Sequence, residues 1–486
     1  MSNSKKTHIR NENRDNSLIN TEMQKNPIKK AWPALVSQLL IAINISIFFF
    51  NSLVISTLIW PGEPFHSQEM GFFLGIGTWV IAFVGLAYGK LTDQISRKKL
   101  FVFTNFLLGI SFIGFSVIPT GLGNLTFVLF FICNIINAVA RGGNVPLINS
   151  YTNDVIEEGE KSHYFGLSDA FYQLFQISGL LIGALVFQFS IWRIYFLIYG
   201  IVGILLGVLI AIKAKEPKRG MLKEELKETL NNNDAVYDYT LTKDMVKQTI
   251  IRPTNIIAFF EGIFTTLLLG IPDFLMIAFF QSPPYNMAPF SMALFMIIFG
   301  LPGGVLGGLT FGKLSDKIGK KDIRCRIIMI SLSILVFFVL YLVIFNSTYQ
   351  PMTPEQGSNI GYLLSNPTMI FLGILAFFAR FSQGIYNMNQ PPILQKINLP
   401  EAQGQVSSWN LMLEAIGSGA APILGGILLV LFDMNYQKTV NLTMSIGAIG
   451  AFCWILGLVW VRKDVERVSN ILKDRAEEMN QNISEN

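Results

Sequence analysis

The repetition of long apolar runs is the strongest constraint on how this chain of 486 residues can fold. Of its residues 51% are hydrophobic and only 14% are charged. Crossing a bilayer takes about 20 mostly apolar helical residues. Twelve runs have the required length, so we expect twelve membrane-spanning helices. They lie near residues 34–58, 70–88, 100–118, 125–150, 165–189, 192–212, 254–280, 287–311, 327–345, 367–390, 406–431 and 441–461.

The same composition excludes a protein with a soluble core. Cys133, Cys325 and Cys453 are scattered among the runs, so we expect them only to pack, without forming a disulfide or a metal site. The sequence contains no nucleotide-binding loop, zinc motif or catalytic triad. We therefore expect neither an enzyme nor an ATP-driven pump, and no cofactor or nucleic-acid partner.

Polar segments divide the runs into two sets of six. They predict a disordered cytoplasmic tail and a linker with a short amphipathic surface helix at 221–230, followed at the end of the chain by an amphipathic tail. The predicted division is a tail at 1–31, a six-helix bundle at 32–212, a linker at 213–253, a second bundle at 254–461 and a tail at 462–486.

Basic residues indicate the orientation of these helices. Lys and Arg gather in the two tails, in the linker and in the connections at 90–99 and 313–326, whereas the alternate connections contain almost none. Because positive charge is retained on the cytoplasmic side, both termini are predicted to be cytoplasmic.

One connection occurs twice. The segment GKLTDQISRKK at 89–99 and the segment GKLSDKIGKKD at 312–322 place Gly, Lys, Leu, a hydroxyl residue, Asp, Ile and a basic pair at the same offsets. A carboxylate at such a turn can accept N–H groups at the start of a neighbouring helix, or pair with basic residues of its own loop. The duplication indicates that the two bundles are structural repeats.

This loop, which reads GxLxDxxx[RK][RK] after the second and eighth spans, resembles the signature loop of the major facilitator superfamily. The resemblance implies an all-α membrane protein of twelve helices in two pseudo-symmetric six-helix bundles, with a substrate site between them and alternating access. It also implies that Asp93 and Asp316 latch the bundles together on the cytoplasmic side. The candidate latch residues are Gly89, Asp93, Arg97, Gly312, Asp316 and Lys320.

Two spans carry matching arginines on polar helix faces. The fourth span contains ARGGN and the tenth ARFSQG, and the tenth better matches the Arg-x-x-Gln motif that the family associates with proton coupling. An intramembrane Arg is costly unless it faces water or an acid, so we expect Arg141 and Arg380 to face each other across the cavity. Alternatively, each arginine has a structural role and joins the ends of neighbouring helices. The substrate-binding candidates are Asn44, Asn137, Arg141, Asn144, Arg380, Gln383 and Asn387.

Acidic residues within the spans are the candidates for proton coupling, because no Asp or Glu lies between Trp32 and Trp60 in the first span. They are Glu261, Asp273 and Glu414, with Glu414 favoured because Asn410 and Ser418 share its face. Alternatively, Glu414 pairs permanently with a basic residue. Pro272 is expected to interrupt the seventh span and to free carbonyl groups near Asp273.

These features predict a secondary active transporter of the cell membrane that moves a small organic solute, anionic or amphiphilic. We expect a monomer whose partners are the substrate, the bilayer and protons. KEPKRG at 215–220 and NLPEAQG at 398–404 also resemble the Spinster-like branch, which implies an alternative as a lysolipid or lipid translocase. A sensor that keeps the fold and binds substrate without transport is a further alternative.

Overall fold

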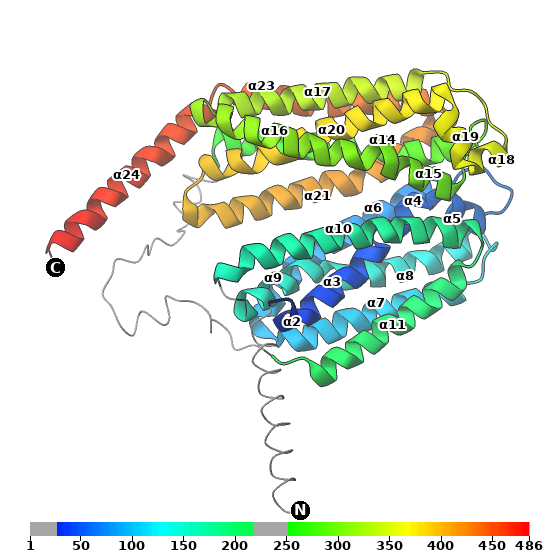
Figure 1. Ribbon diagram of the computed structural model, residues 1–486, viewed down its shortest axis with the longest axis horizontal. Helices are drawn as coiled ribbons and strands as arrows, with labels where there is room; N and C mark the ends of the chain where they lie inside the picture. The colour runs from blue at the N-terminus through cyan, green and yellow to red at the C-terminus, as the bar shows by residue number, and fades with distance from the viewer. Residues whose placement is uncertain (1–26, 157, 217–250, 486) are drawn as a thin grey trace, which may run out of the picture.

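The computed structural model describes residues 27–156, 158–216 and 251–485, and all regular secondary structure in those ranges is helical (Figure 1). In these ranges twelve helices are long and apolar enough to span a bilayer, from Trp32–Phe50 to Tyr436–Gly457. The predicted twelve spans are therefore confirmed. The predicted surface helix at 221–230 lies outside the described residues.

The first bundle contains spans one to six. The short α2 (Pro27–Lys30) precedes it, and the first span consists of three consecutive helical pieces. Its helices are α3 (Trp32–Asn44), α4 (Ile47–Phe50), α5 (Ser52–Ile59), α6 (Ser67–Gln94), α7 (Arg97–Val117), α8 (Asn124–Gly142), α9 (Asn144–Val155), α10 (Glu158–Gln188) and α11 (Trp192–Lys213).

The second bundle contains spans seven to twelve, and α24 follows it as the predicted helix at the end of the chain. The eighth span includes a π-helical turn at Met296–Gly300. The helices are α14 (Pro253–Gln281), α15 (Pro289–Phe295), α16 (Leu301–Lys321), α17 (Arg324–Asn346), α18 (Pro354–Ser358), α19 (Ile360–Ser365), α20 (Pro367–Lys396), α21 (Pro400–Leu431), α22 (Tyr436–Gly447), α23 (Ile449–Gly457) and α24 (Val461–Glu485).

Both ends of the described chain, α2 and α24, lie on one side of the molecule, which we call the terminal side (Figure 1). The helices α5, α18 and α19 lie on the opposite side, the distal side (Figure 1). That the terminal side faces the cytoplasm stays a prediction from the charges of the loops.

Interruptions of the spans differ from those expected. The first span is broken before Ile47 and at Asn51, whose side-chain amide donates to the Ile47 carbonyl at 2.8 Å. By contrast, α14 continues through Pro272, so the expected interruption of the seventh span was wrong. Proline removes one backbone hydrogen bond, but Pro272 is buried among apolar neighbours, and this packing keeps the helix continuous.

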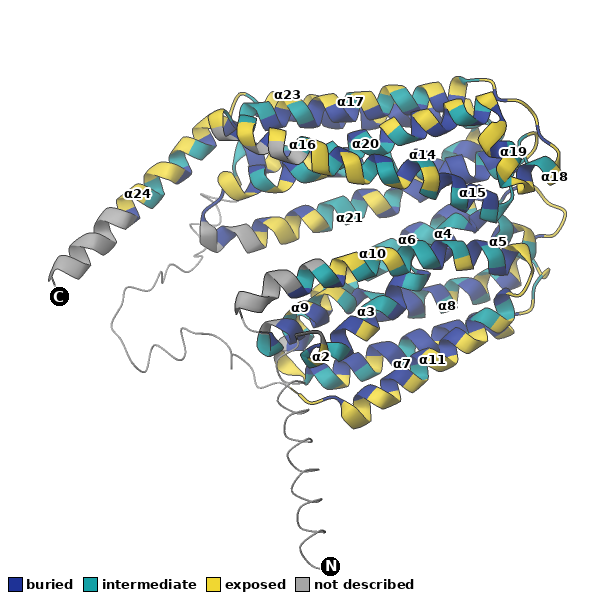
Figure 2. Ribbon diagram, viewed as in Figure 1, coloured by how far each residue is buried: buried dark blue, intermediate teal, exposed yellow. Residues whose placement is uncertain are grey.

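Burial follows the helix faces (Figure 2). Apolar side chains that face other helices are buried, while many on the outer faces are exposed, as a bilayer requires. In the first bundle, Phe48 forms the centre of an aromatic cluster, with ring centroids 4.7–6.2 Å from those of Phe73, Phe112, Phe115 and Phe196. Such pairs stabilise a core beyond the area that they bury, and this cluster holds α4 in place.

The two bundles meet closely where α6 packs on α21, in the distal half of both helices. A Cβ atom at Gly71 or Gly75 would overlap the carbonyl oxygen of Pro422 or Gly419, so only glycine permits this approach. The Trp79 indole donates to the Ile416 carbonyl at 3.0 Å. We call this contact the glycine seam.

The glycine seam ends at Trp79. Farther toward the terminal side, the α6 side chains Phe83 and Leu86 are 53% and 52% exposed, and Trp409 of α21 is also exposed. The bundles are therefore closed on the distal side, and these apolar residues of α6 and α21 are exposed on the terminal side.

Candidate functional site

Arg97, a predicted latch residue, is the first residue of α7 and is only 2% exposed. Its Nη1 lies 2.8 Å from Oδ2 of Asp154 in α9, and its Nε lies 3.0 Å from Oε1 of Glu216, which follows α11. Glu216 also accepts hydrogen bonds from the Ser96 hydroxyl and from the backbone N–H groups of Arg97 and Lys98, at 2.6–3.0 Å. We call Arg97, Asp154 and Glu216 the arginine clamp.

The charge of Glu216 suits this position. Partial burial alone would raise the pKa of its carboxyl group, but the hydrogen bonds and the Arg97 charge outweigh burial and lower it below the usual value. The carboxylate also sits at the positive N-terminus of α7. The arginine clamp thus joins three segments of one bundle on the terminal side.

The other latch candidates are placed only in part. Gly89 lies within α6, with open space where a Cβ atom would be. Asp93, Gly312, Asp316 and Lys320 have side chains or surroundings outside the part that the structure describes, so their latch role stays a prediction.

Arg380 of α20 has a counter-ion within its own bundle. Its Nη2 lies 2.8 Å from Oδ1 of Asp273 in α14, and its Nη1 donates to Gln383 at 2.7 Å. The hydroxyl of Tyr341 in α17 donates to the same Asp273 oxygen at 2.7 Å. Two predicted roles, substrate anchor for Arg380 and proton carrier for Asp273, thus fall on two members of one ion pair.

The polar face of α20 lines a large cavity. Arg380, Gln383 and Asn387 contribute to a space of about 620 Å³, with Gln173 of α10 on the other bundle. A second cavity of about 390 Å³ shares Arg380 and adds Ser46, so both lie between the bundles. Volumes of this size are typical of small-molecule sites.

Arg141 of α8 lines a different and smaller cavity of about 130 Å³. The second bundle contributes Gly270 and Ser418 to its wall. Within the described residues Arg141 has neither a hydrogen bond nor an ion pair. The phenol groups of Tyr172 and Tyr199 are close enough to interact with its charge electrostatically. We expected Arg141 and Arg380 to face each other across one cavity. In this conformation they line separate cavities, and residues 45–50 contribute to the walls of both.

The remaining predicted substrate residues lie within the first bundle. The Asn137 side chain is buried and donates to Ser111 of α7 at 3.2 Å, and Asn44 accepts from the Tyr195 hydroxyl at 3.3 Å. Asn144 lines only a void of about 10 Å³ between α3 and α7. Asn137 and Asn44 therefore bond to neighbouring helices in this structure, whereas the buried Asn144 Oδ1 has no hydrogen-bond partner in the described part of the chain.

Glu261 and Glu414 lie close together in the second bundle. A Cβ atom at Gly262 would be 3.0 Å from Cγ of Glu414, so Glu414 packs against the backbone next to Glu261. Glu414 Oε1 accepts from the side chains of Gln390 and Asn410, at 3.0 and 2.7 Å. Among the described residues its hydrogen-bond partners are therefore amides, and the predicted alternative, pairing with a basic residue, is not observed here.

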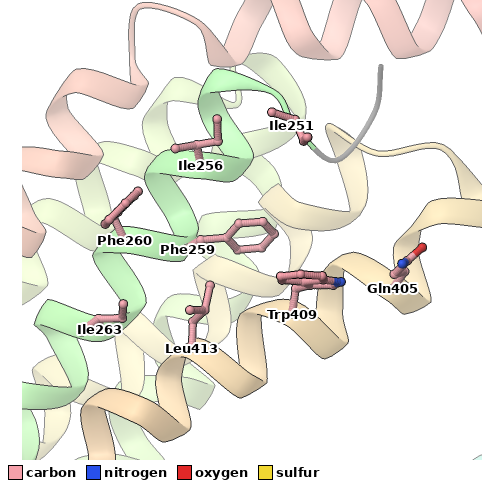
Figure 3. A pocket seen from close by; sticks show the side chains of 8 residues that line it. All are labelled: Ile251, Ile256, Phe259, Phe260, Ile263, Gln405, Trp409 and Leu413. Atoms are coloured by element: carbon pink, nitrogen blue, oxygen red, sulfur yellow. The ribbon is translucent and has the colours of Figure 1, made fainter. Parts of the chain in front are cut away.

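An apolar groove of about 420 Å³ runs between α14 and α21 beside these acids (Figure 3). Phe259 and Leu413 point toward Trp409, and Gln405 lies at one end (Figure 3). The groove lies on the terminal side of the glycine seam, where Trp409 is exposed. Its full lining is Ile251, Ile256, Phe259, Phe260, Ile263, Gln405, Trp409 and Leu413.

Comparison with known proteins establishes the family. The family model described as Major Facilitator Superfamily matches residues 39–354, which is more than half of the chain. The chain belongs to the major facilitator superfamily. It is a multi-pass protein of the cell membrane with the fold of transporters. Multidrug resistance protein 2 of Bacillus subtilis (strain 168) is 24% identical over 381 residues, which cover 77% of this chain and 82% of that protein.

Solved structures of other major facilitator proteins share the fold. A bacterial homologue of the human lysosomal transporter Spinster, inward-facing and unoccupied, superposes with a TM-score of 0.67 at 14% identity, over 90% of this chain and 98% of that one. A D-xylose-proton symporter gives a TM-score of 0.60 at 16% identity, over 88% and 97%.

In this major facilitator protein, sequence reasoning missed the partners of the predicted residues. Glu216 lies in the KEPKRG segment, so its place after the sixth span was a visible signal. Asp154 and Tyr341 carried no such signal, because their partners Arg97 and Asp273 lie far away in the sequence.

Proposed function

We propose that this protein is a secondary active transporter of a small organic anion with an apolar part, and that Arg141 binds the anionic group. The observation that carries the proposal is the environment of Arg141. Its guanidinium lines a cavity built by both bundles, and within the described residues no carboxylate pairs with it. An intramembrane charge without a counter-ion is costly, so a substrate anion would stabilise it.

Arg380 supports a different role in the same proposal. Because Asp273 already neutralises it, Arg380 contributes a polar wall to the larger cavities. The anionic group binds in the cavity of about 130 Å³, and the apolar part extends toward the two larger cavities when residues 45–50 move. The broken first span suits such a movement, since α4 is a single turn between two interruptions.

Ligand stabilisation of the purified protein in nanodiscs tests the anchor. Decyl phosphate and decanoate serve as anionic probes, and decanamide serves as their neutral counterpart. A hydrogen bond to a charged group contributes about 1.5–3 kcal/mol, so Arg141→Ala should weaken binding of the anionic probes by about 10- to 150-fold. Decanamide should be unaffected, and Arg141→Lys should recover only part of the affinity, because lysine lacks the planar fork.

The matched control is Arg193→Ala, which removes a cation that donates to the Ser116 carbonyl at 2.9 Å, away from the three cavities. It should leave binding of the anionic probes unchanged. Unchanged affinity in a well-folded Arg141→Ala variant would assign Arg141 to structure instead. Uptake of a stabilising probe into proteoliposomes then separates transport from sensing.

The apolar groove favours a second candidate function, movement of a lysolipid-like amphiphile. The groove is lined almost wholly by apolar side chains, and Ile251, Phe260 and Trp409 in its wall are exposed, so an acyl chain would suit it. Competition distinguishes the two candidates. A lysolipid that displaces decyl phosphate and is itself translocated supports the second function, whereas displacement without translocation supports the first.

A further inference from the structure

We propose that Glu261 and Glu414 together hold one exchangeable proton, which makes them a proton-binding site in the second bundle. The role of this site in driving transport rests on the proposed function, but the binding of the proton does not. Glu261 lies in α14 and is 0% exposed, whereas Glu414 of α21 is only partly buried.

The first argument is charge. The titratable groups that face Glu261 come from three neighbouring helices: Glu414 from α21, Tyr386 from α20 and Cys453 from α23. Within the described residues, neither carboxyl group has a salt bridge to Lys, Arg or His. A buried carboxylate and a partly buried one beside it repel each other when no cation is present, and one proton on the pair removes this repulsion.

The second argument is unsatisfied hydrogen bonding. Glu261 Oε1 accepts from the Thr265 hydroxyl, but Glu261 Oε2 is buried and has no hydrogen-bond partner. The Tyr386 hydroxyl and the Trp454 indole N–H interact with Glu261, but neither makes a well-formed hydrogen bond, and both are buried. Buried polar atoms are normally paired. With a proton bound, Glu261 Oε2 would be an O–H donor. Without it, the same oxygen would accept from the Tyr386 hydroxyl and the Trp454 indole N–H.

The third argument is the choice of ion. N–H groups of Gln390 and Asn410 and the Thr265 hydroxyl already donate to the carboxyl oxygens. A metal ion would have to displace these donors, whereas a proton adds only one O–H bond. The described residues also contain no group of three His, Cys, Asp or Glu side chains arranged for a metal.

The position of the pair gives a route for the proton. Leu413 lines the apolar groove (Figure 3) and precedes Glu414, while Ser418, one turn farther along α21, lines the cavity of Arg141. Along α21, Glu414 therefore lies between a residue of the groove and a residue of that cavity. In the proposed exchange, hydronium in the cavity forms an O–H bond with a Glu414 oxygen and leaves water behind. The proton then passes to Glu261 Oε2 as the O–H bond on Glu414 breaks.

Infrared difference spectroscopy of the purified protein in nanodiscs, between about pH 5 and about pH 9, tests this site without any substrate. The wild type should show the carbonyl band of one protonated carboxyl group per chain, and the band should decrease as the pH rises. Labelling with ¹³C-glutamate should shift the band, which assigns it to Glu even if a variant fails to fold. The titrating band should disappear in both Glu261→Gln and Glu414→Gln.

Asp273→Asn is the matched control, because Asp273 is also an acid within a span but has Arg380 as its partner. It should keep the titrating band. Absence of the band in wild type, or its survival in both Glu variants, would overturn the proposal. Loss in only one variant would overturn the sharing of the proton, and removal of the band by sodium at fixed pH would overturn the assignment to a proton. Since no substrate is present, these outcomes are independent of the Arg141 anchor.

Discussion

Replacing Arg97 by alanine should destabilise the first bundle by about 2–3 kcal/mol. Removing one partner of a buried ion pair costs about 3–5 kcal/mol. The value here is smaller because the Glu216 side chain is 34% exposed and keeps three other donors, so solvent screens its share. The Asp154 side chain is only 15% exposed, so solvent compensates its lost ion pair less than that of Glu216. Asp154 therefore accounts for most of the loss in unfolding free energy.

This change is large enough to measure as a melting temperature. For a unit of 150–250 residues, 1 kcal/mol corresponds to about 2–4 °C, so Arg97→Ala should lower the melting temperature of the first bundle by about 5–10 °C. A thiol-reactive dye reports unfolding through the native cysteines. With Cys325 and Cys453 replaced by serine, Cys133 of α8 reports the first bundle alone.

Two comparisons make the result specific. Arg462 and Glu466 form an exposed ion pair at 3.0 Å, so Arg462→Ala should change the melting temperature little. In an Asp154→Asn background, Arg97→Ala should cost clearly less than in wild type. A shift of Arg97→Ala no larger than that of Arg462→Ala would refute the reasoning, and an equal cost with and without Asp154 would remove Asp154 as its source.

Folding lowers the pKa of Glu216, so the stabilisation that this carboxylate gives is complete above the unfolded pKa of about 4.3 and is lost as the pH falls through the folded pKa. Acid should therefore lower the melting temperature of wild type more than that of Glu216→Gln. Parallel curves of melting temperature against pH for the two proteins would contradict this. Gly75→Ala should disturb the glycine seam and so disfavour the conformation that is closed on the distal side and exposed on the terminal side. Labelling of a cysteine at Leu86 from the terminal side should therefore decrease. Unchanged labelling would show that the seam tolerates a methyl group. Cysteines placed in the first tail and in the connection at 346–366 should label from opposite sides of the membrane, and labelling from the same side would reject the predicted orientation. Asp93→Asn and Asp316→Asn should slow flux of a transported probe while leaving the melting temperature near wild type, and normal flux would exclude a latch role for that residue.

The sequence was sufficient for the twelve spans because each apolar run is long enough to cross a bilayer on its own. It also indicated Arg380, Asp273, Glu261 and Glu414, since a charge within a span is conspicuous. Their partners were not predictable. Whether Arg380 meets Asp273 or Arg141 meets a carboxylate depends on how separate helices are rotated, and no local pattern reports that rotation.

Local rules also failed where packing decides. Pro272 was expected to break α14, yet its buried neighbours hold the helix, while the first span breaks near Ser46 without any proline or glycine. The arginine clamp shows the same limit. Arg97 was recognised as part of a repeated loop, but its contacts with Asp154 and Glu216 depend on three segments meeting at the terminal side.

The glycine seam has a consequence for the speed of opening. Along Gly71, Gly75, Gly419 and Gly426 the two helices touch through backbone, and the Ile423 and Trp79 side chains pack against Gly75 and Gly419. Separation there lifts these two side chains from the glycines that they cover, and the cost of uncovering their apolar surface slows opening. Ser67 and Trp79 lie near the two ends of this contact, and each donates one hydrogen bond to a carbonyl of α21. A larger side chain at one of these glycines would slow or block the movement even where it left each bundle fully folded.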